Sequence, residues 1–341
     1  MPTSTREIHL AARPVGAAKA TDFRMVDATL PDPGPDDVLV RTIAMSVDPY
    51  MRGRMNAAKS YAPPWELNEA ALGSAIGEVV ASEVDLLPVG TLVRHGHGWR
   101  DYALLPASAV TVIAPLPGLP LTVHLSALGG IGLTAYAGLL DVAEFEDGDR
   151  VFVSGAAGAV GSLAGQFARL RGAPQIIGSA GSADKVRWLT DELGFTDAFD
   201  YHDGPVRDLL LAAAPHGIDV FFDNVGYDHL EAAIEAANPF ARFALCGSIA
   251  GYNVDPKPPG PDNLSLMVGK RIMAKGFIVG DHTDLQEAFQ AEVGDWLRDG
   301  KLVTRETIVE GLDHAVEAFL GLLDGANTGK MIVRLAPDPE D

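Results

Sequence analysis

The sequence predicts an α/β protein in which a doubly wound parallel sheet of the Rossmann type accompanies a β-rich domain. Three observations support this prediction. Short strand patterns between proline and glycine clusters fill residues 1–127, whereas strands and helices alternate from residue 128 onward. Early in that alternation, the apolar strand 150–153 runs directly into the glycine-rich turn 155–161 and then into an apolar helix.

The expected elements follow from the spacing of apolar residues. Strand patterns in the first region, separated by turn residues, favour a small barrel or sandwich. Alternating helix and strand patterns in the second region indicate a parallel sheet covered on both faces. We expect strands at 37–43, 77–81, 91–93, 150–153, 175–179, 220–223, 242–246, 276–279 and 330–335, and helices at 124–142, 160–171, 183–193, 206–213, 228–237 and 285–299.

Length, charge and cysteine content narrow the class of protein. A chain of 341 residues with 47% hydrophobic and 21% charged residues is expected to form two domains. Its net charge of −20 argues against binding to nucleic acids or to anionic membranes. Cys246 is the only cysteine, and residues 1–16 lack the layout of a signal peptide, so we expect a cytoplasmic protein.

The turn 155–161 has the properties of a dinucleotide phosphate loop. A Cβ atom at Gly158 would obstruct the approach of a pyrophosphate, and Gly161 allows the following helix to pack closely. The first amides of that helix and its positive end would then face the anion. Ala156 replaces the first glycine of the usual fingerprint, so the strand–turn–helix context is needed for the interpretation.

The end of the second strand indicates which dinucleotide binds. Enzymes that use NAD usually place a carboxylate there to accept a hydrogen bond from the ribose 2′-hydroxyl. Residues 178–183 contain no carboxylate, and Asp184 is better explained as a partner of the next helix dipole. Small residues leave room for a 2′-phosphate, and Lys185 is placed to pair with it. The sequence therefore favours NADP over NAD.

A metal centre is not expected. Zinc-dependent dehydrogenases use cysteine, histidine and glutamate ligands, and often a second site of four cysteines. The single cysteine lies after the phosphate loop, and His95 and His97 have no third ligand in view. We interpret these two histidines as solvated loop residues.

Several segments, taken together, resemble one family. They match the zinc-independent medium-chain dehydrogenases/reductases, and more narrowly the leukotriene B4 dehydrogenase, prostaglandin reductase and bacterial curcumin reductase group of NADP-dependent alkene reductases. The matching segments occur in order along nearly the whole chain. They are Ser46-Val47-Asp48-Pro49-Tyr50-Met51-Arg52-Gly53-Arg54-Met55 and residues 132–139, 222–226, 246–253, 258–261, 276–279 and 327–333. Tyr227 departs from the family, which often has a second glycine there.

The resemblance implies domain boundaries, an assembly and a set of cofactor contacts. A GroES-like catalytic domain would comprise residues 1–127 plus 307–341, with a Rossmann NADP-binding domain, residues 128–306, inserted between them. Two copies would form a homodimer, often through the edges of the nucleotide-domain sheets. The implied cofactor contacts are Gly158, Ala159, Val160, Gly161, Lys185, Tyr201, Asn224, Cys246, Gly247, Ser248, Ile249, Tyr252, Phe277, Ile278, Val279 and Asn327.

The expected reaction is NADPH-dependent reduction of the C=C bond of α,β-unsaturated ketones and aldehydes, with hydride delivered to the β-carbon. Tyr50 is the candidate donor to the enolate oxygen, although it could instead be a core residue. Tyr252 would line the nicotinamide side, and Arg52 would act as a structural clamp. Two alternatives remain open: an NADPH-dependent quinone reductase and a non-catalytic NADPH-binding protein.

Three aromatic residues and the cysteine complete the list of candidates. Trp65, Trp99 and Tyr61 could line a substrate pocket, although large aromatic side chains more often belong to a core. Cys246 has no pattern of a neighbouring base and is expected to be a strand-end residue beside the cofactor, not a nucleophile.

Overall fold

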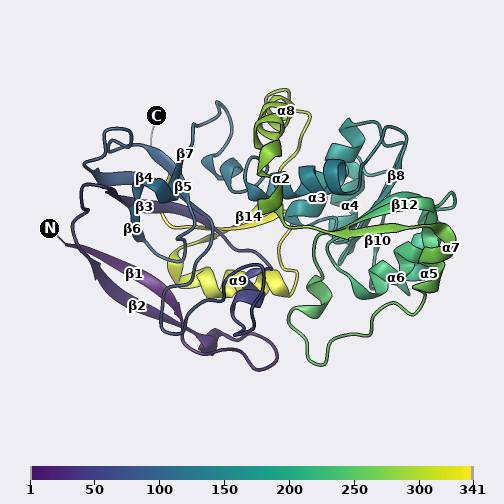
Figure 1. Cartoon of the computed structure of the whole chain (residues 1–341), viewed down its shortest axis with the longest axis horizontal. Helices are drawn as coiled ribbons and strands as arrows, with labels where there is room; N and C mark the ends of the chain where they lie inside the picture. Colours follow the sequence, from purple (N-terminus) through teal and green to yellow (C-terminus); the bar gives the residue numbers. More distant parts are fainter. Residues whose placement is uncertain (1, 339–341) are drawn as a thin grey trace. The chain divides into compact units, whose positions relative to one another are not determined.

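The computed structural model describes residues 2–338, in which the chain divides into two units. The nucleotide unit comprises Ser126–Arg305 and Thr328–Lys330. The other, the β-rich unit, comprises the described residues of 2–125, 306–327 and 331–338. The chain therefore leaves the β-rich unit after residue 125, builds most of the nucleotide unit and returns at residue 306; it then crosses briefly to the nucleotide unit at residues 328–330 (Figure 1).

The nucleotide unit contains the predicted doubly wound sheet. Its six strands among the described residues are all parallel and follow the order β10-β9-β8-β11-β12-β13. From β8 the chain first adds strands on one side, β9 and β10, and then on the other, β11 to β13. Long apolar runs form these strands because both faces of the sheet are covered. The bounds are β8 (Arg150–Val153), β9 (Gln175–Ala180), β10 (Asp197–Asp200), β11 (Ile218–Asp223), β12 (Ala237–Leu245) and β13 (Met273–Gly276).

Helices cover both faces of this sheet. Figure 1 shows α3 and α4 on one face and α5 and α6 on the other, as the alternating connections require. The bounds are α2 (Gly130–Ala137), α3 (Ala159–Leu170), α4 (Ala183–Asp191), α5 (Val206–Ala213), α6 (Tyr227–Ala236), α7 (Ser265–Lys270) and α8 (Gln286–Arg298).

The β-rich unit is organised around one long strand, β3 (Asp37–Ser46). Its first half pairs antiparallel with β6, its second half pairs with β15, and β4 pairs along its other edge. A separate antiparallel pair is formed by β1 and β2. The remaining bounds are β1 (Thr3–Leu10), β2 (Phe23–Leu30), α1 (Met51–Arg54), β4 (Ala75–Ser82), β5 (Leu92–His95), β6 (Tyr102–Pro106), β7 (Val110–Val112), β14 (Glu306–Glu310), α9 (Ala315–Leu323) and β15 (Lys330–Arg334).

An aromatic cluster forms the core of the β-rich unit. The Trp99 ring stacks on Phe23 at 5.9 Å and meets Trp65 and Phe319 edge-on at 5.7 and 5.9 Å. Trp65 and Trp99 are fully buried, so neither lines a substrate pocket, whereas Tyr61 is 63% exposed. The core interpretation of these two tryptophans is therefore the correct one.

Two expected elements were wrongly placed. The apolar run 124–142 is not one helix: α2 begins only at Gly130, and a π-helix follows it over Gly138–Val142. The apolar spacing of residues 125–129 reflects burial in a turn, not helical period. The last strand of the sheet is Met273–Gly276, so Phe277 and Ile278 lie beyond its end.

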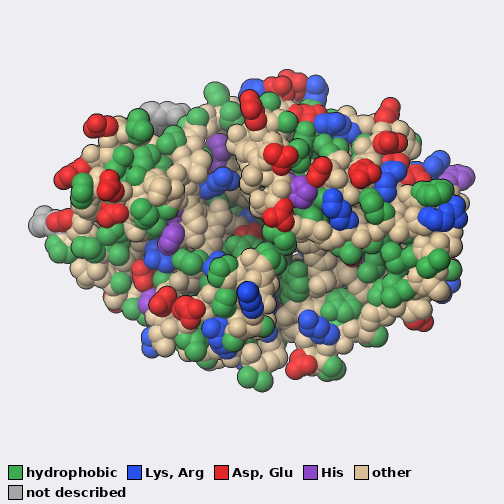
Figure 2. Space-filling model, viewed as in Figure 1, with side chains coloured by type: hydrophobic (Ala, Val, Ile, Leu, Met, Phe, Trp, Pro, Cys, Tyr) green, Lys and Arg blue, Asp and Glu red, His purple; other side chains and the backbone are tan. Residues whose placement is uncertain are grey.

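Acidic residues are dispersed over the face of the molecule that Figure 2 shows. On the face drawn in Figure 2 they are interspersed with basic and apolar side chains and form no single patch. No helix within residues 2–338 combines the length and the apolar character that a membrane crossing requires.

The stacked phenylalanines of the parallel sheet test its packing. Phe152 is 0% exposed and stacks on Phe221 at 5.0 Å. We expect Phe152→Ala to lower the free energy of unfolding by about 3–5 kcal/mol, because it leaves a cavity. Leu86→Ala is the control, since Leu86 is 87% exposed, and should cost under about 1 kcal/mol. Urea unfolding measures both, and equal losses would contradict this view of the core.

Candidate active site

The phosphate loop has the geometry that a pyrophosphate site requires. Gly155 follows β8 with φ +58, a left-handed conformation that favours glycine. A Cβ atom on Gly161 would lie 2.6 Å from the Gly155 carbonyl oxygen, so the first turn of α3 packs against the loop only because Gly161 has none. The first intrahelical bond runs from Ser162 N to Gly158 O at 3.0 Å. The amides of residues 159–161 therefore precede the bonded ladder of the helix.

Gly158 stands at the point where the loop becomes the helix. It is the N-cap of α3 with an extended backbone, and an added Cβ would meet the Gly155 carbonyl oxygen at 3.2 Å. Gly329 N donates to Ala157 O at 2.8 Å and supports the outer side of the loop. Within the loop itself, the backbone requires glycine at two positions: at Gly155 because of its left-handed conformation, and at Gly161 because of its close packing.

A buried carboxylate behind the loop, which sequence reasoning missed, organises the neighbouring strand ends. Asp223 ends β11, is 2% exposed, and accepts hydrogen bonds from Ser154 Oγ at 2.8 Å and Gly226 N at 2.9 Å. Burial raises the pKa of Asp223 above its ordinary value, against the lowering effect of these bonds. Asn224 is fixed through Ser154, to whose carbonyl oxygen its side-chain amide donates at 2.8 Å. The Asp-Asn-Val-Gly turn directly after a buried strand was the available signal.

Lys185 and Tyr201 come together at the tip of the second strand. Ser182 is the N-cap of α4 and accepts from Lys185 N at 3.3 Å, which starts the helix at that point. Tyr201 N donates to Ala180 O at 3.1 Å, and the Tyr201 hydroxyl lies over Gly181, where an added Cβ would be 2.7 Å away. Partial burial lowers the pKa of Lys185 and raises that of Tyr201.

Asp184 does not occupy the position of a ribose acceptor. Its carboxylate is highly exposed and pairs with Arg187 along the same helix. The start of α4, just beyond β9, therefore carries a lysine, and the Tyr201 phenol lies over Gly181 beside it. An ammonium group and a phenol suit a phosphate better than a ribose hydroxyl.

The segment after β12 is anchored to the same strand ends. Cys246 N and Gly247 N both donate to Asp223 O, at 2.9 and 3.0 Å, and Ile249 N donates to Asn224 O at 3.1 Å. The Tyr252 hydroxyl accepts from Ser248 N at 3.2 Å, so its oxygen already supports this turn. Burial raises the pKa of Tyr252, and it raises the pKa of the Cys246 thiol to about 12. A thiol held protonated in this way is a poor nucleophile.

Residues 277–279 follow β13 and are the last segment of the nucleotide unit in which cofactor contacts are predicted. The Phe277 ring packs edge-on against Phe222 at 6.4 Å and against His282 at 5.9 Å. His282 Nδ1 lies 2.8 Å from a carboxylate oxygen of Asp141, which belongs to the π-helix. Asn327 is a buried residue of the β-rich unit and immediately precedes Thr328 of the nucleotide unit.

Tyr50 lies at the start of α1, directly after the turn that follows β3. In that turn the buried Ser46 hydroxyl donates to the Asp48 carboxylate. Burial and the Asp48 charge raise the pKa of Tyr50 to about 12, so its phenol stays protonated and can act as a donor. Arg52 serves as a backbone clamp, as expected, and donates to Gly16 O at 2.7 Å and Asn56 Oδ1 at 3.0 Å.

His95 is not a solvated loop residue, which corrects the sequence interpretation, whereas His97 lies in the loop after β5 and is partly exposed. His95 is the last residue of β5 and only 4% exposed, and burial lowers its pKa to about 3. His97 is half-buried, and its pKa is also lowered by burial. Within residues 2–338, no three histidine, cysteine, aspartate or glutamate side chains are grouped so that they could hold a metal ion.

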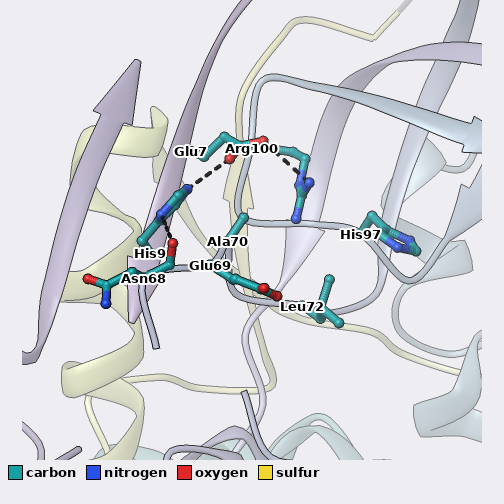
Figure 3. Close-up of a pocket in the computed structure, with 8 residues that line it drawn as sticks. All are labelled: Glu7, His9, Asn68, Glu69, Ala70, Leu72, His97 and Arg100. Atoms are coloured by element: carbon teal, nitrogen blue, oxygen red, sulfur yellow. Dashed lines mark hydrogen bonds and ion pairs between the residues drawn. The ribbon is translucent and has the colours of Figure 1, made fainter. Parts of the chain in front are cut away.

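The β-rich unit also contains a cavity of about 410 Å³, drawn in Figure 3. Glu7 lies between two partners: its Oε2 is 2.8 Å from His9 Nε2, and its Oε1 is 3.3 Å from an Arg100 nitrogen. His9 Nδ1 in turn lies 2.8 Å from Asn68 O. None of the residues that line this cavity is among the predicted catalytic or cofactor-binding residues.

Comparisons with known proteins agree with this geometry. A family profile described as "N-terminal domain of oxidoreductase" matches residues 6–113, and one described as "Zinc-binding dehydrogenase" matches residues 159–293. The putative NADP-dependent oxidoreductase YfmJ of Bacillus subtilis is 40% identical and covers 99% of this chain and 100% of its own. The NADPH-dependent curcumin reductase of Escherichia coli is 38% identical, with 96% of each chain covered.

A solved structure extends the comparison to three dimensions. The crystal structure of CurA from Vibrio vulnificus in complex with NADPH is 38% identical in sequence, with a TM-score of 0.92. The match covers 98% of this chain and 100% of that one.

The tip of the second strand yields a prediction about cofactor choice. We expect Lys185→Ala to weaken NADPH binding by about 1–3 kcal/mol, the scale for losing a charge-assisted partner, and to leave NADH binding nearly unchanged. Arg187→Ala is the matched control, because Arg187 lies two residues after Lys185 in α4 and its side chain is exposed. Fluorescence titration of both cofactors gives the dissociation constants; equal losses for NADPH and NADH would refute a role at the 2′-phosphate.

Proposed function

The chain belongs to the medium-chain dehydrogenase/reductase superfamily, in its group of curcumin reductase-like NADP-dependent oxidoreductases, and we propose that it reduces the C=C bond of α,β-unsaturated ketones and aldehydes with NADPH. The observation that carries this proposal is Tyr50, a phenol that burial keeps protonated at the start of α1. Such a donor suits a reaction in which negative charge develops on a carbonyl oxygen.

The residues of the nucleotide unit would bind and orient the cofactor. The amides of residues 159–161 and the N-terminus of α3 would hold the pyrophosphate, and Lys185 and Tyr201 the 2′-phosphate. Segments 246–252 and 277–279, anchored through Asp223 and Phe222, would enclose the nicotinamide half. When bound, NADPH supplies the hydride for the β-carbon of the substrate.

Tyr50 would act on the substrate carbonyl. Its phenol donates a hydrogen bond to that oxygen, which gains negative charge as the enolate forms. The α-carbon then takes a proton from water or from a neighbouring acid. Tyr252 is less suited to be this acid, because its hydroxyl oxygen accepts from Ser248 N. We therefore assign Tyr252 to shaping the nicotinamide side.

A panel of acceptors tests the reaction class. We expect NADPH oxidation with 2-alkenals, enones and curcuminoids, and no reduction of NADP+ by simple alcohols, because the proposed chemistry is reduction of a polarised C=C bond and not alcohol oxidation. Turnover of 1,4-benzoquinones with no enone turnover would instead identify a quinone reductase. Tight NADPH binding without turnover of any acceptor would identify a non-catalytic binding protein.

Tyr50→Phe tests the donor. We expect it to lower kcat on an enone by about 10²-fold and to leave the KM for NADPH unchanged, because the lost bond forms with the developing enolate. Tyr102→Phe, in β6 of the same unit, is the matched control. The Tyr50 pKa of about 12 predicts no loss of kcat from its ionisation between about pH 6 and 9, since the protonated form persists throughout. An unchanged kcat in Tyr50→Phe would return this residue to a structural role.

We also propose that the protein forms a homodimer through the β13 edge of the parallel sheet. β13 is the terminal strand of that sheet among the described residues, and an open strand edge favours pairing with another strand. Exposed apolar residues lie on β12, which pairs with β13, and on α7, which packs against β12. Phe240 of β12 is 63% exposed, and Val268 of α7 is 80% exposed.

Light scattering coupled to size-exclusion chromatography tests this assembly. Val268→Glu should raise the dissociation constant of the dimer at least about tenfold, because it introduces a charge into an apolar contact. Val89→Glu is the control, because Val89 is also exposed but belongs to the β-rich unit. A monomeric native protein at micromolar concentration would contradict the proposal.

A further inference from the structure

The Tyr201 ring contacts two histidine rings, one exposed and one buried. His202 is exposed, and its ring centre lies 4.3 Å from that of Tyr201. His229 of α6 is 2% exposed, and its ring meets Tyr201 edge-on, with the ring centres 5.6 Å apart and an angle of 77° between the planes. Such an arrangement is favourable for a pair of aromatic rings. Tyr201 is itself 38% exposed, so the buried histidine supports a side chain that a ligand can still reach.

The orientation of the His229 ring is fixed by its neighbour in α6. Its Nδ1 lies 2.9 Å from Asp228 Oδ1, and its backbone N donates to the same oxygen at 2.9 Å. The side-chain bond with His229 lowers the pKa of Asp228, so the carboxylate is ionised and can only accept. Nδ1 of His229 therefore carries a hydrogen and donates it, which sets the rotation of the ring about its Cβ–Cγ bond.

The other nitrogen of this ring shows that apolar packing alone does not account for a histidine here. His229 Nε2 is buried and has no hydrogen-bond partner among residues 2–338. An unpaired buried nitrogen destabilises a fold, and an apolar side chain at this position would avoid that cost. What histidine adds is a flat ring whose orientation is set by Asp228. The residue that this orientation affects is the one in ring contact with it, Tyr201.

Tyr201 is one of the predicted contacts of the 2′-phosphate. Its hydroxyl lies over Gly181, just beyond β9, where an added Cβ atom would be 2.7 Å away. Its backbone N donates to Ala180 O at 3.1 Å, which anchors the main chain, whereas the ring contacts hold the side chain. A side chain that is already held in place loses less conformational entropy when a ligand binds. The support from His229 therefore affects how tightly the phenol can bind a phosphate.

We propose that His229 is a positioning residue for the cofactor: its ring, oriented by Asp228, holds Tyr201 at the 2′-phosphate and so raises the preference for NADPH over NADH. This inference rests on the proposed function, because it requires Tyr201 to contact the 2′-phosphate. It goes further in naming a buried residue, outside the proposed cofactor contacts, that determines specificity. NADH has no 2′-phosphate, so the contribution of His229 is confined to NADPH.

Fluorescence titration with NADPH and with NADH tests this role and needs no substrate. We expect His229→Leu to raise the dissociation constant of NADPH about fivefold, the scale of a lost aromatic pair, and that of NADH less than about twofold. In the Tyr201→Phe background the same substitution should change NADPH binding less than about twofold, because no hydroxyl remains to be positioned. His229→Phe should keep part of the preference, since a phenyl ring can still meet Tyr201 edge-on.

Ile234→Ala is the matched control, because Ile234 is also buried on α6, five residues after His229. It should leave the ratio of the two dissociation constants unchanged. Equal losses for NADPH and NADH in His229→Leu would overturn the proposal, and so would equal NADPH losses in the native and Tyr201→Phe backgrounds.

Fluorine NMR of a fluorotyrosine placed at position 201 alone supplies a readout that does not depend on the cofactor. In the free protein, His229→Leu should shift this signal, because the neighbouring ring is lost, and Ile234→Ala should not. An unchanged signal in His229→Leu would contradict the support of Tyr201. Equal affinity of the native protein for NADPH and NADH would instead overturn the cofactor preference on which this inference rests, and the fluorine signal would still show whether His229 holds Tyr201.

Discussion

The nucleotide unit depends on the close packing of α3 against the phosphate loop that precedes it. The helix can pack there because Gly161 places no Cβ atom against the Gly155 carbonyl oxygen, 2.6 Å from where that atom would stand. Gly155 makes the turn in a left-handed conformation, and Asp223 ties the neighbouring strand ends together by a buried network. An uncompensated buried carboxylate would be costly, so these bonds also fix the loop geometry. The proposed cofactor contacts in the phosphate loop and at residues 246–249 are built around this frame.

In the proposed reaction, the β-rich unit would contribute one donor, Tyr50. Burial and the Asp48 charge raise the pKa of Tyr50, and the Arg54 charge lowers it. The aromatic core beneath holds Trp65, and through Trp65 the support of Arg54. The aromatic core therefore supports α1, the short helix that begins directly after Tyr50.

The sequence predicted the fold class well because buried parallel strands and a glycine-rich turn leave local patterns. It placed the helix 206–213 without error and displaced the final sheet strand by several residues, because the apolar run continues past Gly276 into a turn. Lys185 was predicted as a cofactor contact from the absence of a carboxylate at a strand tip, and it stays a prediction. Asp223 was not predicted, because its role depends on burial and on a partner far away in sequence, which periodicity does not report. His95 was misjudged for the same reason: a polar residue in a short strand can still face the core.

The position of the transferred hydride tests the central claim most directly. The protein would reduce an α,β-unsaturated ketone with NADPH carrying deuterium at the transferred position, and NMR of the product would locate the label. The account predicts a saturated ketone with deuterium on the β-carbon, because Tyr50 stabilises an enolate and the hydride enters at the far end of the conjugated system. An allylic alcohol with deuterium on the former carbonyl carbon would contradict it.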